Sequence, residues 1–217
     1  MLTAPHRPAT LRVVNYHLTP ARHAAIFDRE FAALAARYAP VRQDDLAEYL
    51  TTGRWPMGRD GVLPVFYNGY RNNFDVARPL LDKHGLVGWF MAVTGYSSCP
   101  TAGQRTFAAT QRLTTLPDEY ADGRSALSWD ELRQLDGPHV VGSHTRNHSR
   151  VGLADAAVIH AEVVGAQDDF TRELGHPVRS FAWLCGGRYG ENPVADAAVG
   201  QAGHEFLFSN LAVQKLR

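Results

Sequence analysis

Short apolar runs of the β-strand type alternate along this chain with longer segments of helical periodicity. Six runs are expected to form strands, at 11–16, 62–67, 87–93, 139–143, 180–184 and 205–209. The spacing of apolar residues between them predicts helices at 22–38, 44–50, 73–84, 128–135, 153–174 and 192–203. Alternating strands and helices favour a parallel sheet or barrel with right-handed crossovers. We therefore predict an α/β fold of about six βα units.

Two stretches depart from this regular pattern. Pro79 lies inside the helix predicted at 73–84 and should kink it, because proline lacks a backbone donor and crowds the preceding turn. The stretch 94–126 is rich in Gly, Thr, Ser and Pro and is predicted to be one long irregular loop. Six strands are few for a closed barrel, and Arg217 follows soon after the sixth. The barrel is therefore expected either to stay open or to lack a closing segment.

Composition is that of an ordinary globular protein, and it argues against several functions. Of the 217 residues, 45% are hydrophobic and 20% are charged, which fits a single domain over 1–217. The 22 basic and 22 acidic side chains cancel, which argues against a nucleic-acid surface or a polybasic membrane patch. No apolar run approaches the ~20 residues of a membrane span, and 1–10 shows no export signal, so a cytoplasmic protein is expected. Cys99 and Cys185 are expected to be free thiols.

The most informative motif is a pair of histidines, His144 and His148, directly after the apolar run 140–142. A strand that ends in His-x-x-x-His can direct both rings to one point beyond the sheet, where α/β folds place their chemistry. Neutral imidazole is a common ligand of zinc. The pair indicates a metal site, with a pH-sensitive surface turn as the alternative. His17, at the end of the first predicted strand, could be a third ligand or could simply pack at the mouth.

Three segments, in order and at predicted strand ends, resemble the polysaccharide deacetylase family, the NodB-homology domain of carbohydrate esterase family 4. Segment 65–74 carries Tyr67-Asn68-Gly69-Tyr70 where the family has Asp-Asp-Gly-Tyr. Segment 143–148 matches His-Ser/Thr-x-x-His, and segment 179–186 is similar to Phe-Ala-Tyr-Pro-Tyr-Gly. Weaker matches lie at 15–17 and 127–132. The resemblance covers about 12–210 and implies a deformed (β/α) barrel of the deacetylase type with about six strands.

The departures from the family pattern fall on its chemistry. The family's first Asp is the general base and its second Asp is a metal ligand, and Tyr67 and Asn68 occupy these two positions. A phenol with a pKa near ~10 is a poor base at neutral pH, and Asn68 offers only a neutral carbonyl oxygen. Asn68 fits equally well as the turn residue before Gly69. The late histidine that usually protonates the leaving amine has no counterpart, since His204 precedes the last predicted strand.

Roles are also predicted for four further residues, of which the resemblance implies those of Cys185 and Arg179. The backbone N–H of Cys185 is expected to bind the oxyanion, because a change of side chain leaves that donor in place. Arg179 is predicted to be a charge partner of the site, with a surface or phosphate-binding role as the alternative. Tyr70 and Trp183 could offer an aromatic platform for a sugar ring, although such residues more often belong to the core.

Three functions are consistent with these residues. The first is a metal-dependent deacetylase-like hydrolase of an N-acetyl or related amide, with impaired or altered chemistry and a divalent metal, expected to be zinc. The second is an inactive homologue that binds a carbohydrate or small molecule, and the third is a changed reaction on the same scaffold. No nucleic-acid or membrane partner is expected. A homo-oligomer in which a second copy completes the barrel is a further alternative. The predicted ligands are Asn68, His144, His148 and His17, the catalytic residues are Tyr67, Cys185 and Arg179, and the substrate-binding residues are Tyr70 and Trp183.

Overall fold

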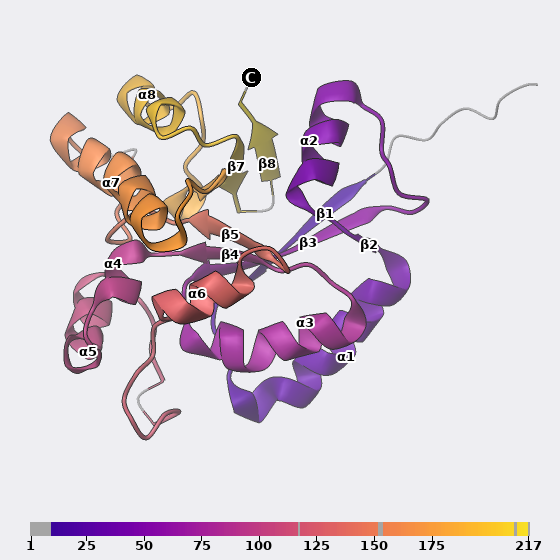
Figure 1. Cartoon of the computed structure of the whole chain (residues 1–217), viewed down its shortest axis with the longest axis horizontal. Helices are drawn as coiled ribbons and strands as arrows, with labels where there is room; N and C mark the ends of the chain where they lie inside the picture. The colour runs from indigo at the N-terminus through magenta and orange to yellow at the C-terminus, as the bar shows by residue number, and fades with distance from the viewer. Residues whose placement is uncertain (1–9, 117, 152–153, 211, 217) are drawn as a thin grey trace, which may run out of the picture.

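The computed structural model describes residues 10–116, 118–151, 154–210 and 212–216, which form one curved sheet with helices around it (Figure 1). All six predicted strands form, with small shifts of their ends. They are β1 (Leu11–Tyr16), β3 (Gly61–Asn68), β4 (Trp89–Ala92), β5 (Val140–Ser143), β6 (Ser180–Ala182) and β7 (Phe206–Ser209). Two strands escaped prediction, β2 (Ala39–Pro40) and β8 (Ala212–Lys215). β2 has only two residues and β8 is half exposed, so neither has the apolar run that marks a buried strand.

The sheet bends into a nearly closed barrel with the strand order β1-β3-β4-β5-β6-β7-β8. Its pairs are parallel except for the antiparallel hairpin of β7 and β8. β2 pairs with Gly61 and Val62 of β3, ahead of the point where β4 begins to pair at Val65. Within the described ranges β1 and β8 do not pair with each other, so the barrel is open there, as one of the two alternatives predicted.

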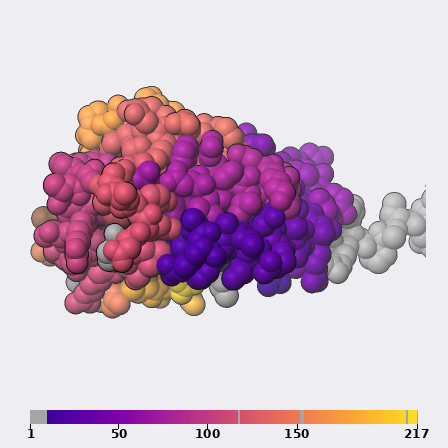
Figure 2. All heavy atoms as spheres, turned by 90° about the horizontal axis from the view of Figure 1, so that it is seen from below, coloured from indigo at the N-terminus to yellow at the C-terminus, as the bar shows by residue number. Residues whose placement is uncertain are grey.

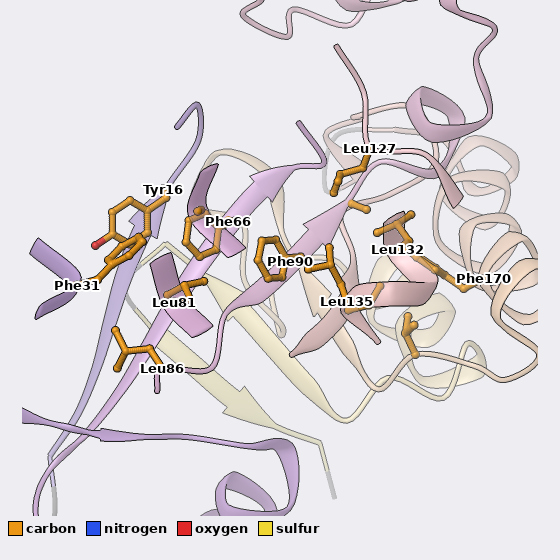
Figure 3. Close-up of a cluster of buried hydrophobic side chains, with 14 of the residues drawn as sticks. Tyr16, Phe31, Phe66, Leu81, Leu86, Phe90, Leu127, Leu132, Leu135 and Phe170 are labelled. Atoms are coloured by element: carbon orange, nitrogen blue, oxygen red, sulfur yellow. The ribbon is translucent and has the colours of Figure 1, made fainter. Parts of the chain in front are cut away.

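Alternation along each strand sorts the apolar side chains into two layers. In β3, Leu63 and Val65 belong to the inner cluster together with Trp89 of β4. Val62 and Phe66 belong to the outer cluster, which lies between the sheet and the helices. Figure 3 shows this outer cluster, in which rings from three neighbouring strands form a row. Tyr16 stacks on Phe66 and Phe66 stacks on Phe90, each pair with ring centroids 4.9 Å apart. The interior of the barrel is therefore a packed core, and a site can form only at its ends.

Helices cover the outer surface of the sheet. On one side α1 (Ala24–Arg37) and α3 (Arg78–His84) lie next to each other, and Figure 2 shows this side. Further helices are α2 (Gln43–Thr52), α6 (Trp129–Leu135), α7 (Ala156–Leu174) and α8 (Pro193–Gln201). The capping box predicted before α6 is confirmed, because Ser128 and Glu131 exchange hydrogen bonds of 3.2 and 2.8 Å. A short 3₁₀ turn, η1 (Ala21–His23), precedes α1.

The irregular loop predicted over 94–126 is wrong in its first half. That segment contains α4 (Thr94–Ser98) and α5 (Thr101–Thr110). Their Gly- and Thr-rich sequence does not predict these helices, because tertiary contacts stabilise them. The Gln104 side chain is buried and accepts hydrogen bonds from the backbone N–H groups of Ser125 and Ala126, at 2.8 and 3.0 Å. Tertiary packing thus overrides weak helix propensity here.

The kink expected at Pro79 takes the form of a π-helical turn, η2 (Asn73–Ala77), directly before α3. Pro79 then lies in the first turn of α3, where its missing N–H costs nothing. Helix α7 begins at Ala156 after the cap Asp155, and the start predicted at 153 lies outside the described residues. Both cysteines are free, as predicted. Among the described helices, none is both long and apolar enough to cross a membrane.

The buried His204 makes fold stability depend on pH. Its ring lies against Phe181, its Nδ1 donates to the Val178 carbonyl at 3.1 Å, and its buried Nε2 has no partner in the described part of the chain. Burial lowers the pKa of His204 to about 4. The unfolded chain takes up this proton near pH 6.5, so stability should fall as the pH drops from about 6.5 to 4, by up to about 3 kcal/mol.

We expect His204→Asn to flatten this pH dependence, because the asparagine amide can still donate to Val178 but cannot titrate. Urea unfolding of both proteins between pH 4 and 7.5 measures the difference, and the other histidines contribute equally to both curves. Identical pH slopes would show that His204 is not the group responsible.

Candidate functional site

A cleft of about 460 Å³ opens at the carboxyl ends of the strands. Five strands deliver residues to it from their last positions or from the turns that follow, which is where parallel α/β folds place ligands. The remaining lining comes from the segment after α5. The lining residues are Asn15, His17, Leu18, Tyr67, Asn68, Tyr70, Arg112, Thr114, His144, His148, Trp183, Leu184, Cys185 and Asn210.

Left-handed backbone is concentrated at this cleft. In the described ranges, six non-glycine residues have positive φ, between 49° and 78°. All but one of them line the cleft, and the exception, Thr145, lies between the two histidines. Such backbone costs about 1–3 kcal/mol per residue and persists only where surrounding structure enforces it. The six residues are Asn68, Arg112, Thr145, His148, Cys185 and Asn210.

The two histidines of the motif share this cleft, with ring centroids 5.3 Å apart. Nδ1 of His144 lies 2.9 Å from the Ala182 carbonyl, and Nδ1 of His148 lies 2.9 Å from the Gln111 carbonyl. A carbonyl only accepts, so each Nδ1 carries the proton and each Nε2 keeps its lone pair. Burial, aided by the neighbouring His148, lowers the pKa of His144 to about 3, and burial also lowers that of His148. Both rings are neutral at pH 7.

Two buried carboxylates on α7 hold the loop that carries these histidines. Glu162 accepts hydrogen bonds from the Asn147 backbone N–H and amide group, both at 2.7 Å. Asp169 accepts from the Arg146 guanidinium at 2.8 and 2.9 Å. Their seven-residue spacing on the buried face of α7 is a signal that the apolar pattern alone does not reveal. Asp169 is only 3% exposed.

Asn68 presents a buried acceptor that nothing satisfies. Its Nδ2 donates to the Tyr70 hydroxyl at 3.1 Å. Its Oδ1 is buried and has no hydrogen-bond partner among the described residues. An unpaired buried acceptor costs about 1–3 kcal/mol, so this atom is poised for a ligand.

Tyr67 ends the inner layer of β3 and lies against two histidines, with ring centroids 5.5 Å from His17 and 5.2 Å from His144. Its hydroxyl makes long contacts, 3.3 Å to Asn15 Oδ1 and 3.4 Å to the Asn210 carbonyl. Burial raises the pKa of Tyr67 well above its ordinary value of 10. The phenol therefore keeps its proton at neutral pH and can donate but cannot act as a base.

His17 lines the cleft as well, and burial lowers its pKa. Yet no three His, Cys, Asp or Glu side chains of the described chain gather as a metal site. The three-histidine arrangement considered from the sequence is therefore not formed. Tyr70 and Trp183 both lie at the cleft, and the buried Trp183 Nε1–H has no acceptor within the described ranges.

Cys185 lies in a 3₁₀ turn at the rim, with an exposed thiol whose Sγ is 3.1 Å from Arg150 Nε. Arg179, in contrast, is not part of this cleft. It precedes β6, at the amino end of the strand, and its guanidinium pairs with Glu205 and Asp44, each at 2.9 Å. The prediction that Arg179 serves the site is wrong, because the strand separates it from the residues that follow β6.

Comparison with solved structures places this fold among polysaccharide deacetylases. The Streptococcus pyogenes deacetylase PplD, solved with acetate, superposes with a TM-score of 0.73 at 14% identity over 96% of this chain and 88% of its own. IcaB from Ammonifex degensii gives 0.66 at 19% identity over 93% and 84%. A de-N-acetylase from Aggregatibacter actinomycetemcomitans gives 0.68 at 18% identity over 95% and 88%. No protein-family model and no curated protein matches the sequence. The chain thus has the deacetylase fold.

The left-handed backbone at Cys185 can be tested by its energetic cost. Cys185→Gly should be more stable than Cys185→Ala by about 1 kcal/mol and should therefore unfold at a higher temperature. Both variants lose the thiol, but only alanine keeps a Cβ at φ 53°. Thermal unfolding of the two variants measures this difference. If the glycine variant is the less stable of the two, the turn is not strained.

Proposed function

We propose that this protein is a divalent-cation-dependent hydrolase that removes an acetyl or related acyl group from an amide. The observation that carries the proposal is a set of three atoms in one cleft that could each give a lone pair to a metal ion. Nε2 of His144, Nε2 of His148 and Oδ1 of Asn68 are all without hydrogen-bond partners in the described chain. The fold shared with PplD and IcaB supports the same reaction class.

The chemistry of these donors fits a borderline cation such as zinc. Metal-bound histidine usually donates its other ring nitrogen to a carbonyl or carboxylate, and both histidines do so here. Their lowered pKa values keep them neutral, as a ligand must be. His144, His148 and Asn68 would hold the ion, and two imidazoles with one amide oxygen form a neutral ligand set. When bound, the cation would polarise the acyl carbonyl and lower the pKa of a water molecule.

The remaining residues of the cleft bind and orient the substrate in this proposal. The backbone N–H of Cys185 donates to the carbonyl oxygen as negative charge develops on it. The protonated Tyr67 hydroxyl donates a hydrogen bond near the acyl group, and Tyr70 and Trp183 pack against the substrate. No Asp or Glu lines the cleft to take a proton, and losing a positioned base typically costs ~10²–10⁴ in rate. We therefore expect slow turnover.

A second candidate is a binding protein without catalysis. The protonated state of Tyr67 and the lack of any Asp or Glu among the lining residues favour it. Metal binding alone does not separate the two candidates, whereas acyl release does.

Zinc titration of protein prepared without chelator tests the ligand assignment. We expect His144→Ala to weaken zinc binding by at least about tenfold, because the loss of one imidazole leaves a single histidine. His160→Ala is the matched control, since His160 is exposed on α7 and should leave the affinity unchanged. Equal zinc affinity in the wild type and His144→Ala would remove the basis for the proposed metal site.

Restoring two carboxylates tests whether the chemistry is impaired. The double variant Tyr67→Asp with Asn68→Asp should release acetate from N-acetylated glucosamine oligomers about 10²–10⁴ times faster than the wild type, because it regains a base and an anionic ligand. Acetate release is measured by an enzyme-coupled assay, with circular dichroism as the check on folding. A folded, zinc-binding double variant with unchanged activity would argue that the missing base is not what limits the reaction.

A further inference from the structure

The charge of the cleft is unusual for a pocket in a protein of zero net charge. None of the lining residues is an Asp or Glu, and Arg112 is the one that carries a permanent charge. A smaller hollow of about 290 Å³ at 42–44, 136–141 and 176–179 provides an internal comparison. There Arg42 and Arg179 occur together with Asp44 and Asp136. The absence of a carboxylate from the larger cleft is thus a local feature.

Arg112 is an exposed residue on a segment whose backbone is bound to the cleft. The preceding residue, Gln111, accepts the hydrogen bond from His148, and the Thr114 backbone is hydrogen-bonded to the Tyr70 hydroxyl. Both anchors are residues of the cleft, and φ of Arg112 itself is 57°. Its guanidinium forms no hydrogen bond or ion pair with any residue in the described ranges, so its five N–H donors remain open to a ligand.

Two further donors point to the same chemistry. Arg150 donates to Cys185 Sγ at 3.1 Å and has no carboxylate partner in the described part of the chain. The buried indole N–H of Trp183 also lacks an acceptor there. The cleft therefore carries positive charge and has no carboxylate among its lining residues to balance it.

We propose that the substrate carries an anionic group, a carboxylate or a phosphate, which binds to Arg112. The planar guanidinium fork matches both groups through paired hydrogen bonds. The proposal rests on the proposed function for the acyl group, while the anion site depends only on Arg112 and its surroundings. An anion site at Arg112 would distinguish this cleft from one that binds only neutral sugars.

Binding of three N-acetylated probes tests the proposal by titration calorimetry, with and without zinc. N-acetylglucosamine is neutral, its 6-phosphate adds a phosphate, and N-acetylglycine adds a carboxylate. We expect at least one anionic probe to bind about tenfold or more tightly than the neutral one, with an affinity that falls as salt rises. The anionic probe that binds more tightly than the neutral one shows whether the site prefers a phosphate or a carboxylate.

Arg112→Gln should abolish this preference, Arg112→Lys should retain part of it, and Arg105→Gln, an exposed arginine of α5, should leave it intact. Equal affinity for neutral and anionic probes, or a preference that survives in Arg112→Gln, overturns the proposal even if neutral amides are hydrolysed. Binding of an anionic probe that depends on Arg112 supports the proposal. If such a probe binds but no probe loses acetate with zinc present, the anion site stands and the proposed hydrolase function is wrong.

Discussion

The site depends on the way five strands end. At Asn68, Cys185 and Asn210 the chain leaves a parallel strand through left-handed backbone, and His148 adopts the same conformation in the turn after β5. A regular continuation would send successive side chains alternately to the inner and outer layers. The left-handed turns instead bring residues from β3, β5, β6 and β7 to one cleft. Each costs free energy, so the arrangement persists only because the packed scaffold enforces it.

That scaffold holds the turns from two directions. Rows of apolar residues inside and outside the sheet fix the strands in register, and the row from Tyr16 through Phe66 to Phe90 links three of them. Behind the histidine loop, Glu162 and Asp169 use buried carboxylates to bind its backbone and Arg146. The acidic groups near the site thus serve to position the loop, and none reaches the cleft. Any cation bound there would keep most of its charge, which suits an anionic substrate.

The sequence allowed the architecture to be predicted because periodicity reports burial. Strands β1 and β3 to β7 and the main helices follow from apolar spacing, and the paired histidines were recognised from their position after β5. What the sequence did not reveal depends on tertiary contacts. Helices α4 and α5 are stabilised by the buried Gln104, and Arg112 reaches the cleft only because the segment after α5 is bound to His148 and Tyr70. Arg179 was misplaced because a motif match does not say at which end of a strand a residue lies.

The proposed ligands His144, His148 and Asn68 form a neutral set, and whether that set binds a cation is the central question. Diffraction from crystals grown with zinc, recorded at the zinc absorption edge, answers it most directly. We predict one anomalous peak about 2.0–2.1 Å from Nε2 of both His144 and His148, facing Asn68 Oδ1. Well-ordered rings with no shared peak between them would contradict it.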